Sequence, residues 1–113
     1  MYKTVNLTKV NETKTVSEVT RVPRNRDVID IFLCWDSDAY GTANQWTYKD
    51  MLFSYNTLIA VIGGGSNIYV TSTKYSTTTS KFQGQMKRQA EKDNFNIHII
   101  DQKDLEEMVK DRF

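Results

Sequence analysis

The chain has 113 residues, of which 39% are hydrophobic and 26% charged, and its formal net charge is +1. This length and composition predict one globular domain with a modest core, and the near-neutral charge excludes a general attraction to nucleic acid or anionic membranes. No apolar run approaches the roughly 20 residues of a membrane span, and the first residues lack the apolar segment of a secretory signal. We therefore expect a cytoplasmic protein without membrane contact.

The N-terminal part of the chain is rich in Thr, Val and Lys. Its valines favour extended backbone, and Pro23 discourages a helix and closes the segment. We expect an N-terminal extended segment over residues 1–24 and a single domain over residues 25–113.

Residues 27–38 fit two patterns, because their apolar side chains recur both at helix spacing and at strand spacing. Asn25 or Asp27 offers a helix cap, which favours the helix. Asp36 and Asp38 then resemble the start of a calcium loop, but the bidentate carboxylate that such a loop needs at its end is missing. We interpret these carboxylates as helix caps or solvated turn residues.

The strongest local pattern follows a polar connection predicted over residues 41–50. Residues 51–62 are predicted to form one strand and residues 68–73 a second. The glycine-rich run over residues 63–67 tolerates positive φ and is typical of a tight turn. Together these segments predict an antiparallel hairpin over residues 51–73.

A helix is predicted over residues 77–93. Ser76 or a following Thr is a natural N-cap, since its hydroxyl accepts from the free N–H groups of the first turn. Phe82, Met86 and Ala90 recur at intervals of four residues and form a narrow apolar stripe, which we expect to pack on the hairpin.

The C-terminal residues 95–100 are predicted to form a third strand, and a last helix follows Asp101. The expected fold is therefore α+β. It has a small antiparallel sheet, made of hairpin 51–73 and strand 95–100, packed by helices 77–93 and 102–112.

No set of residues in the sequence predicts catalysis or metal binding. His98 is the one histidine and Cys34 the one cysteine, so neither a cysteine zinc site nor an internal disulfide is expected. We interpret Cys34 as a small buried hydrophobe and His98 as a structural residue at the surface or partly buried. The Gly63–Gly65 run lacks the Gly-Lys-Ser/Thr of a phosphate loop. We expect no catalytic residue, no metal and no cofactor, and hence not an enzyme.

Two features around the predicted helix 77–93 point instead to binding. The Ser/Thr run over residues 71–80 lies at a helix N-terminus, where capping or an anion would both fit. No acidic residue lies between Asp50 and Glu91. The resulting basic, aromatic-bearing surface suits a nucleic acid backbone or an acidic protein face. The predicted partner-binding residues are Tyr75, Lys81, Lys87, Arg88 and Lys92.

Three runs of residues carry a resemblance to a known family: Phe53-Ser-Tyr-Asn-Thr-Leu-Ile-Ala, Ile68-Tyr-Val-Thr and Tyr75-Ser-Thr-Thr-Thr-Ser-Lys-Phe-Gln. The pattern, which covers roughly residues 52–90, resembles a family of small uncharacterised proteins encoded by tailed phages and plasmids. The chain departs from it at Phe82, where a His is common, and at Leu58, where a Pro is common. The resemblance implies a phage or mobile-element setting rather than a reaction.

A small accessory protein in that setting is expected to be a counter-defence protein, such as an anti-CRISPR protein. We expect it to inhibit a host CRISPR effector nuclease of type II by stoichiometric protein binding in the host cytoplasm. The alternative is a non-enzymatic nucleic-acid-binding accessory or regulatory protein that uses the same basic residues. The sequence does not indicate an oligomeric state.

Overall fold

The computed structural model describes residues 5–6, 15–16, 19–34, 39–42 and 44–110. The described strands are β1 (Val5–Asn6), β2 (Thr15–Val16), β3 (Thr20–Arg21), β4 (Ala39–Gly41), β5 (Gln45–Tyr48), β6 (Met51–Ser54), β7 (Thr57–Gly63), β8 (Asn67–Thr71) and β9 (Asn96–Ile100). The helices are α2 (Val28–Leu33), α3 (Thr77–Lys92) and α4 (Gln102–Val109). The predictions for Asp36 and Asp38 lie outside the described residues.

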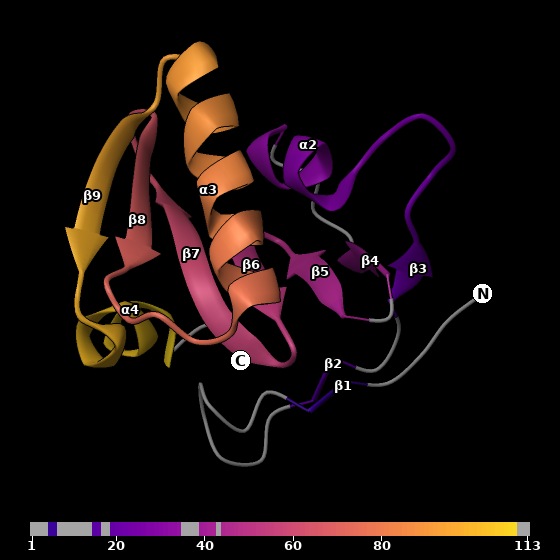
Figure 1. Cartoon of the computed structure of the whole chain (residues 1–113), viewed down its shortest axis with the longest axis horizontal. Helices are drawn as coiled ribbons and strands as arrows, with labels where there is room; N and C mark the ends of the chain where they lie inside the picture. The colour runs from indigo at the N-terminus through magenta and orange to yellow at the C-terminus, as the bar shows by residue number, and fades with distance from the viewer. Residues whose placement is uncertain (1–4, 7–14, 17–18, 35–38, 43, 111–113) are drawn as a thin grey trace.

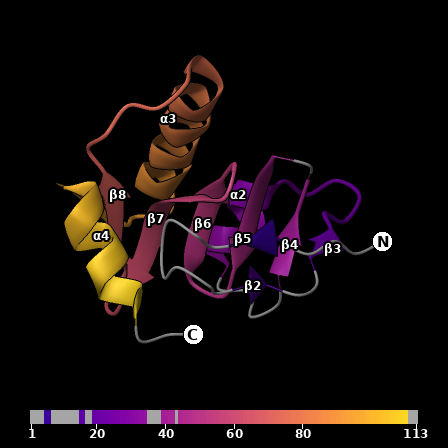
Figure 2. The ribbon, with the colours of Figure 1, turned by 90° about the horizontal axis from the view of Figure 1, so that it is seen from below.

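The main sheet has seven strands in the order β3-β4-β5-β6-β7-β8-β9. Strands β4 to β8 form an antiparallel meander, whereas β3 runs parallel to β4 and β9 runs parallel to β8. Helices α2 and α3 lie on one face of the sheet and α4 on the other (Figures 1 and 2). Strands β1 and β2 form a separate two-stranded ribbon.

The prediction of a small antiparallel sheet is wrong, because the sheet has seven strands and is mixed. Strand β9 is parallel to β8 because the chain returns through α3 rather than through a tight turn. The polar connection expected over residues 41–50 instead contains β5, whose Trp46 is 1% exposed and stacks on Phe53, with ring centroids 4.1 Å apart.

The single strand predicted over residues 51–62 is also wrong, because it is divided into β6 and β7 by a two-residue turn. Tyr55 and Asn56 occupy that turn with φ of 51° and 65°. Two consecutive positive φ values are typical of the tight hairpin turn that matches strand twist. The pairing register shifts next to Leu52 and Phe53, so that Ile59 lies opposite no residue of β6. The predicted turn at Gly63–Asn67 is confirmed between β7 and β8.

The helix predictions agree better with the structure. The segment that fitted both patterns forms helix α2, capped by Asp27, whose Oδ1 accepts from the Asp30 N–H at 2.6 Å. The prediction over residues 77–93 is confirmed by α3, on which Met86 and Ala90 are buried. The last helix begins as predicted after Asp101, and α4 ends at Val109.

The sheet separates two apolar clusters. On the α2 and α3 face, Phe32, Leu52, Ile62 and Met86 are among the buried side chains. On the α4 face, the stacked rings of β5 and β6 belong to the same buried cluster as Leu105 and Val109 of α4. Both helical layers are therefore fixed by buried apolar contacts. No helix in the described part of the chain has the length and apolar character that a membrane span requires.

Candidate partner-binding face of helix α3

The N-terminus of α3 is fixed by hydroxyl groups. Ser76 caps the helix, with its Oγ accepting from the Thr79 N–H at 3.1 Å. The Thr79 hydroxyl lies 3.1 Å from Ser76 Oγ and 2.9 Å from Ser54 Oγ of β6, and both Ser54 and Thr79 are buried. These hydroxyls therefore bond to one another and to the helix backbone. The Ser/Thr run thus contributes a cap and a link between helix and sheet.

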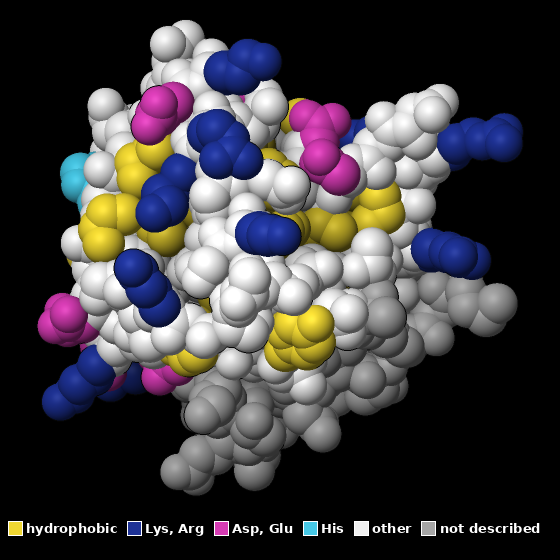
Figure 3. Space-filling model, in the orientation of Figure 1, with side chains coloured by type: hydrophobic (Ala, Val, Ile, Leu, Met, Phe, Trp, Pro, Cys, Tyr) yellow, Lys and Arg dark blue, Asp and Glu magenta, His cyan; other side chains and the backbone are white. Residues whose placement is uncertain are grey.

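The side of α3 that faces away from the sheet is exposed and basic. Figure 3 shows Lys and Arg side chains gathered over this helix, with acidic side chains beside them over α2. We call the exposed side the α3 face. It consists of the α3 residues that line two adjacent hollows: Thr77, Ser80, Lys81, Gly84, Gln85, Arg88, Gln89 and Lys92.

The first hollow lies between α2 and α3 and has a volume of about 520 Å³. Its α3 wall carries Arg88 and Lys92, and its α2 wall carries Asp27 and Asp30. Asp30 is held by Arg26, with 3.6 Å between its Oδ2 and the guanidinium Nε. The hollow therefore presents charges of both signs on facing walls.

The second hollow lies along α3 itself and has a volume of about 440 Å³. Lys81 and Arg88 line it, and Gly84 lies between them along the helix. Arg88 and Gln85 border both hollows. Lys81, Arg88 and Lys92 form no ion pair with any described residue. Three cations therefore lie at the surface without a paired acid among the residues that the structure describes.

Gly84 is an unusual residue at the centre of a 16-residue helix. A glycine there costs roughly 0.5–1 kcal/mol relative to alanine. A methyl group at this position would meet, among the described residues, only the Arg88 guanidinium, whose Nη1 is 3.4 Å from the added carbon. The packing of the described chain therefore does not require glycine. Its effect is to leave the helix backbone bare between two cations.

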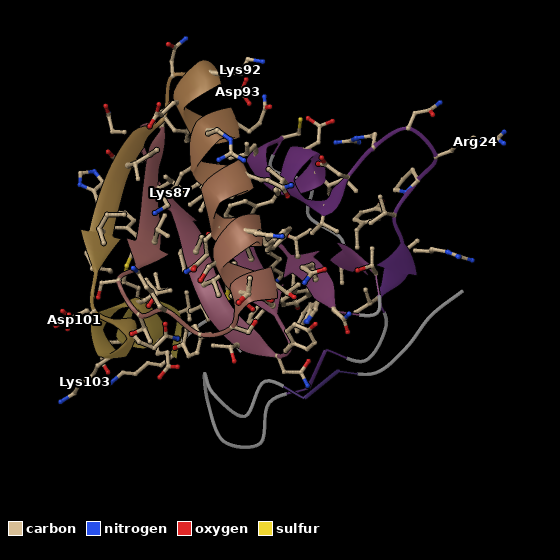
Figure 4. All side chains as sticks on the ribbon, viewed as in Figure 1. Arg24, Lys87, Lys92, Asp93, Asp101 and Lys103 are labelled. Atoms are coloured by element: carbon tan, nitrogen blue, oxygen red, sulfur yellow. The ribbon has the colours of Figure 1, made fainter. Side chains whose placement is uncertain are left out.

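The five predicted partner-binding residues do not form one site. Lys81, Arg88 and Lys92 share the α3 face, whereas Lys87 lies on the side of α3 toward β8 (Figure 4). Tyr75 precedes the N-cap and lies at the opposite end of α3 from Lys92. Sixteen helical residues span about 24 Å, so one small ligand does not contact both ends.

Tyr75 has surroundings of its own, because the chain brings it near α4. Its partial burial raises the pKa of the phenol above the usual 10.0, and the Glu106 carboxylate raises that pKa further. Hydrogen bonds with Thr73 and Thr71 act in the opposite direction. Tyr75 therefore belongs to the contact between the β8–α3 connection and α4 rather than to the α3 face.

The other candidate residues have structural surroundings. His98 Nε2 lies 3.0 Å from Asn67 Oδ1, and its ring stacks on Tyr69 with 4.9 Å between centroids. The interpretation of Cys34 as buried is wrong, because it is the exposed C-cap of α2. In the part of the chain that the structure describes, no three His, Cys, Asp or Glu residues are grouped so that they could hold a metal ion.

The sequence did not predict a role for Gly84 or for the acidic wall that Asp27 and Asp30 form on the α2 side of the first hollow. An isolated glycine within a predicted helix is a signal that could have identified Gly84. Asp27 and Asp30 were not associated with the basic residues because they lie more than 50 positions away in the chain. Only the packing of α2 beside α3 brings the two walls together.

Residues 5–107 match a protein family described as "Family of unknown function (DUF8033)". The chain belongs to this family. The match includes all the residues that line the two hollows. No curated protein and no solved structure matches the chain.

Proposed function

We propose that the protein binds another protein through the α3 face and acts by occlusion rather than by catalysis. The partner we favour is a host defence protein, with a type II CRISPR effector nuclease as the first candidate. In this proposal the protein is a counter-defence factor of a phage or mobile element, working at one copy per target in the host cytoplasm.

The observation that carries the proposal is Gly84 between Lys81 and Arg88. A glycine that destabilises its own helix, and that no described neighbour requires, is explained by an external surface that approaches the backbone closely. The flanking cations form no ion pair with the residues that the structure describes, and the proposal uses them for charge-assisted hydrogen bonds to carboxylates of the partner.

A protein partner fits the mixed charge of the first hollow. Arg88 and Lys92 attract carboxylates, whereas Asp27 and Asp30 attract Lys or Arg side chains and repel phosphates. Interfaces with both signs arranged in register select partners by charge complementarity. The α3 helix is held by its cap and by buried Met86 and Ala90, so binding does not require it to be ordered first.

The counter-defence role rests on the sequence resemblance described above, and the α3 face is compatible with it. Occlusion of a nuclease requires a rigid surface and no reactive group. The proposed contact residues are Lys81, Gly84, Arg88 and Lys92, whereas Tyr75 and Lys87 lie outside the α3 face and are not part of this proposal.

The experiment that tests this function is a titration of the purified protein into DNA cleavage by a type II CRISPR effector nuclease. We expect cleavage to be lost near a one-to-one ratio of protein to nuclease, with no shift of the DNA in a gel without nuclease. The double variant Lys81→Glu/Arg88→Glu should restore cleavage. Lys49→Glu/Lys103→Glu, an equal charge change at two exposed residues outside the α3 face, should still inhibit. Full cleavage at excess protein would contradict the proposed target.

The second candidate function is nucleic acid binding, favoured by the alignment of Lys81, Arg88 and Lys92 along one helix side. It predicts a DNA or RNA gel shift whose affinity falls steeply with salt. Each cation removed would reduce the slope of log affinity against log salt by about one. A shift insensitive to salt would exclude this alternative.

A further inference from the structure

The two edges of the main sheet are built differently. Edge strand β3 has two residues, carries Arg21, and is followed closely by Pro23. These are devices that keep sheet edges from pairing with other chains. Edge strand β9 has five residues, Asn96–Ile100, none of them Asp, Glu, Lys, Arg or Pro. Its pairing with β8 runs without a register shift. The β3 edge of the sheet is therefore protected from pairing with other chains, whereas the β9 edge lacks these protective features.

The backbone of β9 has free hydrogen-bonding groups on its outer side. The Asn96 N–H donates to the Ser66 carbonyl at 2.8 Å, and the Ser72 N–H donates to the Ile100 carbonyl at 2.7 Å. In a parallel strand, every second residue directs its backbone N–H and C=O groups toward the same neighbouring strand. The N–H and C=O groups of Ile97 and Ile99 therefore point away from β8. In the described part of the chain no strand pairs with this side.

The side chains of β9 leave apolar surface exposed at this edge of the sheet. Ile99 is 52% exposed, which is unusual for a large aliphatic side chain in a sheet. Ile97 points to the same face of the strand, because it is two residues away, and is partly buried against the α2 and α3 cluster. A strand added to this edge would cover Ile99 and continue that apolar surface.

We propose that β9 pairs antiparallel with β9 of a second copy, about a twofold axis at His98. This register places Ile97 of each copy opposite Ile99 of the other, as the pair that exchanges backbone hydrogen bonds. The outward groups of both strands are then satisfied, and the exposed Ile99 packs against Ile97 of the other copy. The two seven-stranded sheets become one continuous sheet, and the contact is isologous.

The self-complementarity of the strand favours a second copy over a foreign strand. In this register the exposed Ile99 of each copy is covered by Ile97 of the other, and the twofold axis repeats the same contact on both sides of His98. No residue of β9 is Asp, Glu, Lys or Arg, so the pairing sets no such like charges opposite each other within the strands.

The first test is the solution mass by sedimentation over a range of concentrations. The wild-type chain of 13.1 kDa should approach twice that mass as concentration rises. Ile99→Lys should remain monomeric. Tyr55→Lys is the matched control, because Tyr55 is also 52% exposed but lies in the β6–β7 turn, and it should dimerise like wild type. A wild-type monomer at all concentrations, or a dimer that Ile99→Lys leaves intact, would overturn the proposal.

The second test reads the register directly and uses a Cys34→Ser background to remove the exposed native thiol. In the proposed register the two copies of residue 98 have Cα atoms about 4.5 Å apart, within the range of a disulfide. The two copies of residue 96 are roughly 13 Å apart along the strands. Mild oxidation should therefore give a covalent dimer of His98→Cys and leave Asn96→Cys monomeric. Crosslinking of Asn96→Cys instead, or of neither variant, would overturn the register and with it the proposed dimer.

Discussion

The hydroxyl of Ser54, at the end of β6, lies 2.9 Å from the hydroxyl of Thr79 in the first turn of α3, and both side chains are buried. The pair links the centre of the sheet to the helix that carries the proposed binding face. It also extends the Ser76 cap into the core, since Ser76 Oγ donates to Thr79 Oγ1 at 3.1 Å.

A double-mutant cycle should measure this link. Ser54→Ala and Thr79→Val are each expected to lower the free energy of unfolding by about 1–3 kcal/mol, because each leaves a buried hydroxyl without its partner. The double variant should cost less than the sum of the two, since no Ser54–Thr79 pair then remains to be broken. Chemical denaturation gives the energies. The exposed control Thr78→Val should change stability by less than about 0.5 kcal/mol, and strict additivity would contradict a direct bond.

Gly84→Ala should separate stability from function. The added methyl group improves helix propensity, so the free energy of unfolding should rise by roughly 0.5–1 kcal/mol. Binding of the protein partner should weaken, because the methyl group fills the floor of the second hollow. Nuclease inhibition and thermal denaturation would be measured on the same sample. Thr78→Ala, on α3 but outside both hollows, should gain stability without losing inhibition; an equal effect of both on inhibition would argue against close approach at Gly84.

Asp27 offers a test of the acidic wall. Asp27→Asn keeps an N-cap acceptor and removes the charge, so stability should change by only a few tenths of a kcal/mol. Asp27→Ala should cost about 1 kcal/mol because the cap is lost. If the partner is a protein, Asp27→Asn should weaken binding measured by calorimetry. If the partner is nucleic acid, the same change should strengthen binding, since a carboxylate facing the phosphates is gone.

Tyr75 predicts a stability change at alkaline pH. Its pKa is raised in the folded protein, chiefly by burial and then by Glu106, so the folded state holds the phenolic proton more tightly than the unfolded state. This contribution is fully present below the unfolded pKa of about 10 and is lost as pH rises through the higher folded value. Denaturation of wild type and Tyr75→Phe across that range should show a steeper decline for wild type. Glu106→Gln should reduce the difference, and identical slopes for wild type and Tyr75→Phe would contradict the raised pKa.

The local features of the fold were largely predictable, whereas the sheet was not. Caps at Asp27 and Ser76 and the stripe at Met86 and Ala90 are encoded within single turns of helix, so the sequence pattern locates them. The Tyr55–Asn56 turn was missed because neither residue is glycine and the apolar run continues on both sides. Strand β5 was missed because burial of Trp46 depends on Phe53, a partner in the next strand.

In the candidate site too, local features could be predicted from the sequence and features that depend on distant residues could not. Lys81, Arg88 and Lys92 repeat at helical spacing and were found for that reason. Lys87 and Tyr75 were grouped with them on proximity in sequence, and the helix places them on another side and at another end. The α2 wall could not be predicted, since the contact between α2 and α3 depends on the parallel pairing of the strands on either side of them.

That topology has a consequence for the order of folding. The antiparallel meander from β4 to β8 contains sequence-local hairpins, which close at little entropic cost. The two parallel pairings, β3 with β4 across α2 and β8 with β9 across α3, join strands that are further apart in the chain. These pairings should form last. The hollow between α2 and α3 should then form only after both ends of the sheet have closed. A chain that is still incomplete at either end would lack the assembled α3 face, so a folding intermediate would not capture the proposed partner prematurely.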